Sequence, residues 1–146
     1  GKDMVAEWEI SDVTFNVGQA FTAETFNTTL MVIRLNKKIP AFTMEKEGVL
    51  DLIFDKVIPF KGYKDIDFEA YPDFSKKFLL LGSDEAEIRR FFRKDIIKFF
   101  EKNQLYHIES NGSNLLIFNK TKLARTDETV SFIDFGVRLN QLINKS

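Results

Sequence analysis

Three carboxylates spaced two residues apart are the residues whose type and spacing best suit chemistry: Asp65, Asp67 and Glu69. In an extended segment, side chains two residues apart point to the same side of the chain. Three carboxylates on one side could hold Ca²⁺ or Mg²⁺, both of which prefer oxygen ligands, and Asp73 follows closely. The pattern therefore predicts a candidate metal site at these four acids. The alternative is a row of solvated charges, because the glycine-containing 12-residue loop of an EF-hand is absent.

A second candidate site is basic and consists of Arg89, Arg90, Arg93 and Lys94. Guanidinium groups bind phosphate through paired, charge-assisted hydrogen bonds, so this cluster predicts an anion or lipid-headgroup site. Glu85 lies four residues before Arg89, which is the spacing of helical ion pairs. A solvated helix face with internal ion pairs is therefore the alternative.

Familiar catalytic patterns do not occur in the sequence. His107 is the one histidine and the chain has no cysteine, so multi-histidine metal sites, thiolate chemistry and disulfides are excluded. We expect His107 to be an ordinary exposed or half-buried residue of a strand. No glycine-rich phosphate loop, nucleophile elbow or HExxH motif is present, so catalytic residues stay unassigned and we expect no cofactor.

The length and composition of the chain indicate a single soluble domain over residues 1–146. The chain has 21 basic and 22 acidic residues and a net charge of −1, which argues against a nucleic-acid binder because such proteins usually carry a basic excess. The sequence contains no run of about 18 apolar residues, which is the length needed to span a bilayer. The 16 phenylalanines predict a large aromatic core, since each ring buries roughly 150–250 Å².

Strand signals fill the first third of the chain. Apolar residues alternate with polar ones from Trp8 to Val17, and the alternation changes parity at Ser11-Asp12, which predicts a bulge or bend. The apolar run from Leu30 to Ile33 indicates a central strand. Residues 40–44 indicate a further strand, which we place at an edge because of Pro40.

The middle of the chain is predicted to contain several short helices, strands and turns. Apolar spacing over residues 48–58 predicts a short helix that Pro59 stops. Residues 65–69 form an extended segment, residues 71–73 a turn, and Phe78–Leu81 a buried strand that ends at Gly82.

Two helices and a hairpin are the clearest expectations in the second half. An apolar stripe with an acidic start predicts one long helix over residues 84–103. Asn111-Gly112 between two β-prone runs is a strong hairpin signal. A wide apolar stripe that includes Val130 predicts a buried helix from Thr126 to about Asn144. Gly136 within that helix costs about 1 kcal/mol, which indicates a close approach to a neighbouring element.

Together these elements predict an α+β fold. We expect an antiparallel sheet of about six or seven strands, with the long helix inserted before the last hairpin and a helix at the C-terminus. A small PH-like barrel closed by a C-terminal helix is the alternative architecture.

Several segments of the chain together form a recognisable pattern: Asp65–Glu69, Pro72–Ser75, Phe78–Gly82, Asp84-Glu85 and Ile88-Arg89. This pattern resembles an uncharacterised bacterial family whose members join predicted N-terminal transmembrane helices to a soluble C-terminal domain. The likeness implies that the natural protein extends beyond Gly1 and is held at a membrane through its N-terminal part, with this domain in the cytoplasm. It transfers no activity and no catalytic residue.

Three functions stay open from these observations. The first is a non-catalytic binding or regulatory domain of a membrane-associated bacterial protein, with an unknown protein or lipid partner. The second is a carboxylate- or metal-dependent enzyme that uses the acidic cluster. The third is a lipid-headgroup-binding module that uses the basic cluster. The oligomeric state is not indicated by the sequence.

Overall fold

A computed structural model describes residues 7–17, 24–46, 62–104, 106–119 and 126–145. These residues form a seven-stranded antiparallel sheet and four helices. The strands are β1 (Trp8–Val17), β2 (Glu24–Arg34), β3 (Phe42–Lys46), β4 (Lys64–Asp65), β5 (Phe78–Gly82), β6 (His107–Ser110) and β7 (Asn114–Phe118). The helices are α1 (Pro72–Lys77), α2 (Glu85–Phe91), α3 (Lys94–Lys102) and α4 (Thr126–Asn144).

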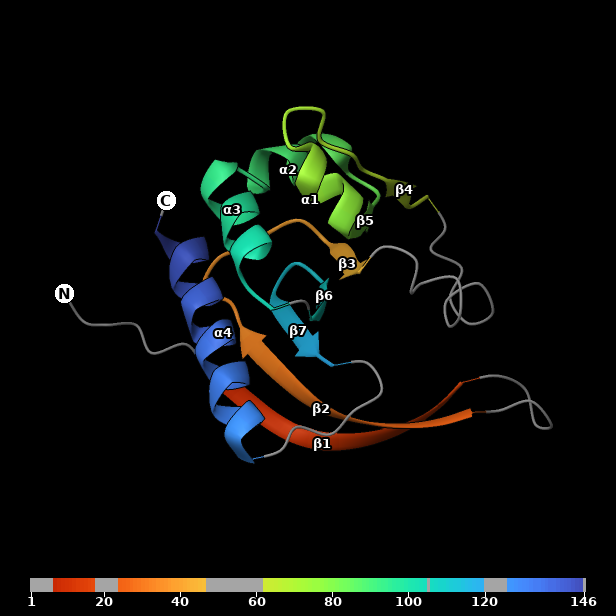
Figure 1. The fold of residues 1–146 in the computed structure, drawn as a ribbon. Helices are drawn as coiled ribbons and strands as arrows, with labels where there is room; N and C mark the ends of the chain where they lie inside the picture. The colour runs from red at the N-terminus through yellow and green to blue at the C-terminus, as the bar shows by residue number, and fades with distance from the viewer. Residues whose placement is uncertain (1–6, 18–23, 47–61, 105, 120–125, 146) are drawn as a thin grey trace.

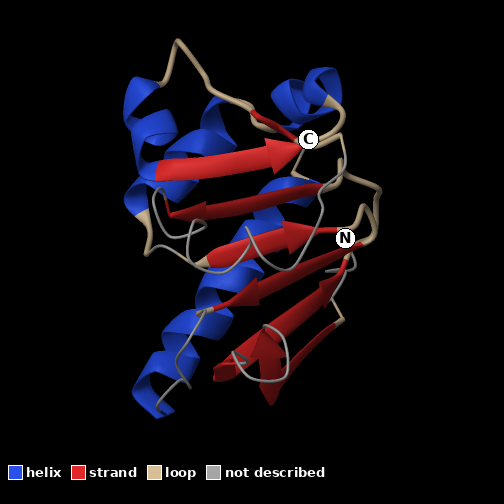
Figure 2. Ribbon diagram, turned by 90° about the vertical axis from the view of Figure 1, so that its right-hand side faces the viewer, coloured by secondary structure: helices blue, strands red, loops and turns tan. Residues whose placement is uncertain are grey.

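The sheet is open, and its strand order is β1-β2-β7-β6-β3-β5-β4 (Figure 1). All four helices lie on one side of it, as Figure 2 shows. We call this side the inner face and the opposite side the outer face. The predicted α+β fold is confirmed, and the alternative barrel is wrong because β1 and β4 end the sheet as separate edges.

The inner face carries one continuous apolar row across five strands. Met31 lies opposite Ile117, Ile117 opposite Ile108, Ile108 opposite Met44, and Met44 opposite Leu80. Each of these side chains is at most 1% exposed. A sheet face of this kind must be covered by other elements to stay out of water.

Phenylalanine rings from the helices and their connections cover this row, which confirms the predicted aromatic core. Phe92 is the centre of the cluster and lies 5.1 Å from Phe42, 6.1 Å from Phe68, 6.0 Å from Phe74 and 6.1 Å from Phe100, between ring centroids. The tilted and edge-on arrangements of these rings are those that aromatic pairs prefer.

The single helix predicted over residues 84–103 is wrong, because the chain forms α2 and α3 with a break at Phe92 and Arg93. Arg93 has extended backbone angles, φ −70° and ψ 168°. In an unbroken helix, each residue lies about 40° further around the axis than the residue four positions before it. Four side chains at this spacing would therefore not all face the core. The break lets four side chains at this spacing all face the core, each at most 3% exposed: Ile88, Phe92, Ile96 and Phe100.

Two expectations about strands are also wrong. The pairing of β1 with β2 continues without a bulge from Trp8 to Val17. This edge strand can tolerate a change of apolar parity because it is covered less fully: Trp8 is 40% exposed. Strand β3 lies inside the sheet between β6 and β5. Pro40 precedes the strand, so its missing N–H interrupts no ladder.

Residues 71–73, predicted as a turn, instead lead into α1. Pro72 occupies the first turn of that helix, where its missing N–H costs nothing, and Phe74 is fully buried. The short helix predicted over residues 48–58 lies outside the described residues. Strand β5 confirms the predicted buried strand at residues 78–81.

The late hairpin and the C-terminal helix are confirmed. Gly112 has φ +97°, while Asn111 accepts hydrogen bonds from the backbone N–H groups of Ser113 and Asn114 through Oδ1. Val130 is 68% exposed, so its place in the apolar stripe of α4 was wrong. Among the described residues, no helix is long and apolar enough to cross a membrane.

Gly136 confirms the predicted close approach, since it brings α4 against β2. A β-carbon at this position would lie 2.5 Å from Sδ of Met31 and 3.2 Å from Cδ1 of Ile33. Helix and strand therefore touch where the glycine has no side chain.

We expect Gly136→Leu to lower the free energy of unfolding by about 1–3 kcal/mol, since overpacking a filled core forces its neighbours to shift. Met31→Ala alone should cost about 2–5 kcal/mol by leaving a cavity. The double variant should cost clearly less than the sum, because the leucine fills the space that Met31 leaves. Chemical denaturation of the four proteins measures this coupling, and strictly additive losses would contradict the contact.

Candidate functional site

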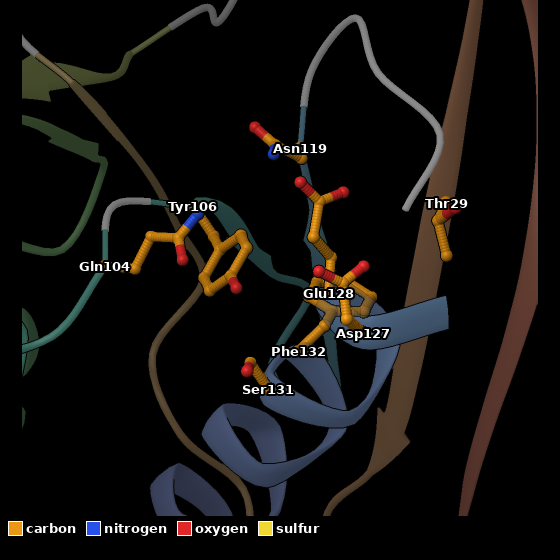
Figure 3. Close-up of a pocket in the computed structure, with 8 residues that line it drawn as sticks. All are labelled: Thr29, Gln104, Tyr106, Asn119, Asp127, Glu128, Ser131 and Phe132. Carbon is orange, nitrogen blue, oxygen red and sulfur yellow. The ribbon is translucent and has the colours of Figure 1, made fainter. Parts of the chain in front are cut away.

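A half-open pocket of about 140 Å³ lies at the start of α4, on the helical side of the sheet (Figure 3). Side chains that are mostly polar come to it from β2, from both sides of the β6-β7 hairpin and from the first two turns of α4. They are Thr29, Gln104, Tyr106, Asn119, Asp127, Glu128, Ser131 and Phe132. Polar groups placed around a concave space are the groups that fix the orientation of a small ligand.

Tyr106 forms one side of this pocket. It is 7% exposed, and its ring packs 5.1 Å from Phe132 and 4.8 Å from Phe135. The described residues give its hydroxyl no hydrogen-bond partner, and the oxygen is open to solvent, since none of their buried polar side-chain atoms lacks a partner.

The Tyr106 hydroxyl stays protonated at neutral pH. Burial raises the pKa of the phenol, and the negative charge of Glu128 raises it further, because both effects disfavour the phenolate. The group can therefore donate a hydrogen bond to whatever enters the pocket, and it can also accept one.

The rim of the pocket is held by bonds to the sheet. The Thr28 hydroxyl donates to the backbone carbonyl of Asn119, and the Thr29 hydroxyl donates to Oδ1 of Asp12 at 2.6 Å. Asp127 and Glu128 lie in the first turn of α4, where the helix dipole stabilises negative charge. Figure 3 shows Tyr106, Asn119 and Glu128 around one space, with Tyr106 just before β6, Asn119 just after β7 and Glu128 on α4. This arrangement suits recognition of a small polar molecule.

His107 corrects the expectation of an ordinary exposed or half-buried histidine. It is 4% exposed, and both ring nitrogens bind carboxylates: Nδ1 lies 2.8 Å from Oε2 of Glu45, and Nε2 lies 2.9 Å from Oε1 of Glu109. The ring also stacks on Phe118, with 4.3 Å between centroids. The cluster of Glu45, His107 and Glu109 therefore joins β3 and β6 on the outer face.

The protonation of this cluster follows from its contacts. Burial lowers the pKa of His107, but the hydrogen bonds and negative charges of Glu109 and Glu45 outweigh it, so the pKa is raised. The raised pKa favours the imidazolium form, which donates from both nitrogens. With both positions occupied and the ring covered, His107 is placed to hold strands together and has no nitrogen left to act as a base.

A shallow apolar groove lies beside this cluster on the outer face. Its volume is about 230 Å³, and its lining consists of Val13, Thr28, Leu30, Glu109, Leu116 and Phe118. The groove and the pocket at the start of α4 lie on opposite faces of the sheet, since Thr28 and Thr29 are neighbours in β2 and point to opposite sides.

Three of the four acids predicted to bind metal surround one open depression. Asp65, Asp67 and Glu69 line it together with Arg89, and burial, followed by the charge of Asp67, raises the pKa of Asp65. Asp73 lies apart, in the first turn of α1. Within the ranges that the structure covers, no three acidic or histidine side chains gather closely enough to hold a metal ion. The metal site stays a prediction.

The basic cluster already has acidic partners, as the alternative interpretation of the sequence expected. Arg89 pairs with Glu85 at 2.8 Å, and Arg90 pairs with Glu87 at 2.7 Å. A third arginine of the cluster, Arg93, pairs with an aspartate at 2.8 Å and also donates to the backbone carbonyl of a residue near the end of α4. Lys94, the fourth member, is exposed at the start of α3. An anion would have to compete with these ion pairs, and the anion site stays a prediction.

Sequence reasoning missed the pocket at the start of α4. The sequence places Tyr106 in the β-prone run before Gly112 and places Asp127 and Glu128 at a helix start, and neither pattern indicates that the two segments meet. Their separation along the chain leaves no short motif, so the pocket follows from the fold alone.

No protein-family model and no curated protein matches this chain. Among solved structures, the chain is similar to the crystal structure of the mycobacterial trehalose monomycolate transport factor A, TtfA. The TM-score is 0.59 at 11% sequence identity, over 99% of this chain and 75% of that chain. At this identity the likeness shows that the two share a fold.

We expect His107→Phe to lower the free energy of unfolding by about 3–5 kcal/mol, because Glu45 would be left as a buried charge without its cation. The double variant Glu45→Leu/His107→Phe should recover most of this loss, since an apolar pair can replace a buried ion pair at little cost. Urea denaturation of the three proteins measures both effects. A double variant no more stable than His107→Phe would contradict the account.

Stability should also depend on pH through His107. Because its pKa is raised on folding, the folded state holds the proton more tightly than the unfolded state. This contribution is fully present below the unfolded value of about 6.5 and is lost as pH rises through the folded pKa. Between pH 6 and pH 9, we expect the wild type to lose stability relative to Glu45→Leu/His107→Phe. Parallel pH profiles of the two proteins would argue against a charged His107.

Proposed function

We propose that this chain is a non-catalytic ligand-binding domain that serves transport in a membrane-associated bacterial protein. The observation that carries the proposal is the pocket at the start of α4, where the Tyr106 hydroxyl lies among polar side chains from separate parts of the chain. A ligand that enters the pocket can take the place of water at this hydroxyl, which can both donate and accept a hydrogen bond.

The chemistry of the pocket favours binding over catalysis. A general acid or base works best with a pKa near the operating pH, whereas burial and Glu128 raise the pKa of Tyr106 further from neutrality. His107, the histidine of the chain, lies on the outer face with both nitrogens bonded to carboxylates. The pocket thus has groups that can recognise a ligand and lacks an evident proton-transfer pair among the residues that line it.

The transport role and the membrane link rest on likeness. A protein with the same fold is named as a transport factor for trehalose monomycolate. The segments around residues 65–89 resemble a family whose soluble domain follows transmembrane helices. Both likenesses support a domain that holds a ligand or partner near a membrane, with an unknown protein or lipid as the partner of the full-length protein.

We expect Ser131→Trp to abolish ligand binding by filling the pocket, while Val130→Trp leaves it intact. Val130 is the neighbouring residue of α4, is 68% exposed and does not line the pocket. A panel of water-soluble sugars, polyamines, amino acids and nucleosides would be screened by thermal shift. A ligand at 100 times its Kd stabilises a protein by about 2.7 kcal/mol, so a true ligand should raise the Tm of the wild type and of Val130→Trp only.

Two results would count against the proposal. If no compound separates Ser131→Trp from Val130→Trp, the pocket is not the binding site. If a compound that binds is converted to a product, as seen by NMR of the mixture over a day, the domain is an enzyme.

A further inference from the structure

We infer that the pocket at the start of α4 takes the pyranose ring of a carbohydrate, a ligand class that rests on and sharpens the proposed function. The inference uses the size of the pocket, the mixture of groups around it and the charge balance at the end of α4.

The size of the pocket suits one six-membered ring. Its volume is about 140 Å³, and in another protein a cavity of roughly 150 Å³ holds a benzene molecule. The pocket is half-open, so substituents on a ring, or a second sugar unit, could extend from it into solvent. A nucleotide or a longer chain would lie mostly outside.

One wall of the pocket is aromatic. The ring of Tyr106 packs against Phe132 at 5.1 Å, and both residues line the cavity. A pyranose has apolar C–H surfaces between its hydroxyls, and these can contact aromatic carbon while the hydroxyls turn to polar groups. Pockets with an apolar wall and a few placed polar groups are the usual form of small-ligand sites.

The polar groups both donate and accept hydrogen bonds. Tyr106 and Ser131 supply hydroxyls, and Gln104 and Asn119 supply amides, which have both functions. Sugar hydroxyls also have both functions, so they can satisfy such a set completely. An ammonium group can only donate and a phosphate mostly accepts, and either would leave some of these groups without a partner.

The charge of the pocket is compatible with a neutral ligand. Asp127 and Glu128 are acidic, but both lie in the first turn of a 19-residue helix, whose N-terminal dipole offsets part of their charge.

The test is a titration of the whole chain with methyl α-D-glucopyranoside, methyl α-D-mannopyranoside and methyl α-D-galactopyranoside, followed by ¹⁵N NMR. We expect at least one to bind with shifts at Tyr106 and Ser131. Tetrahydropyran-2-methanol, which keeps the ring but has one hydroxyl, should bind much more weakly. Putrescine serves as the cationic comparison.

Two variants locate the binding. Tyr106→Phe removes only the hydroxyl and should weaken sugar binding roughly two- to tenfold, the value of one hydrogen bond. Tyr71→Phe makes the same change outside the pocket and should leave the affinity unchanged. The Tm of each variant shows that it is folded, and Ser131→Trp, which blocks the pocket, provides a second variant that should abolish binding.

The outcomes separate this inference from the proposed function. Binding of putrescine but of no sugar, blocked by Ser131→Trp, would overturn the pyranose assignment and leave the binding domain standing. Sugar binding that ignores both Tyr106→Phe and Ser131→Trp would overturn the location. If no sugar, amine or other small molecule binds at the pocket, the ligand class and the proposed function both fail.

Discussion

The cluster of phenylalanine rings between the sheet and its helices is the packing on which the rest of the structure depends. The inner face is apolar across five strands, and protein interiors must fill such a space to near-crystalline density. Phe92 lies at the centre of the cluster, between Phe42 of β3 and Phe74 of α1. Because these rings come from one side only, all the described helices gather there, and the described strands and helices leave the outer face without a helical layer (Figure 2).

The outer face can keep a buried charge because strand register supplies its partners. Glu45 and Glu109 reach His107 from β3 and β6, and the pairing of Met44 with Ile108 sets that meeting. A slip of one residue would turn Glu45 to the inner face, since side chains alternate along a strand. The cluster thus depends on the same register that aligns the apolar row. Ionic groups that fit one register only can favour it over others, although they add little net stability.

Periodicity predicted the elements whose form depends on neighbours in the chain. The hairpin at Gly112 and the helix to Asn144 follow from local turn and stripe signals. The break after Phe91 was not predictable in this way, because it depends on the shape of a core that distant segments of the chain form together. The same limit hid the bonds of His107, whose partner Glu45 lies 62 residues away. It also hid the pocket around Tyr106, which draws residues from four parts of the chain.

The close packing of α4 on β2 explains why a pocket forms at the start of that helix. At Gly136 the helix touches Met31 directly, because there is no side chain between them. One turn earlier, the ring of Phe132 stands between helix and sheet and packs on Tyr106. The space near Thr29 is therefore bounded by a bulky ring on one side and the strand on the other. Helical residues with small or polar side chains, such as Ser131, cannot fill it. The helix is thus anchored tightly at its middle and leaves room for a ligand at its beginning.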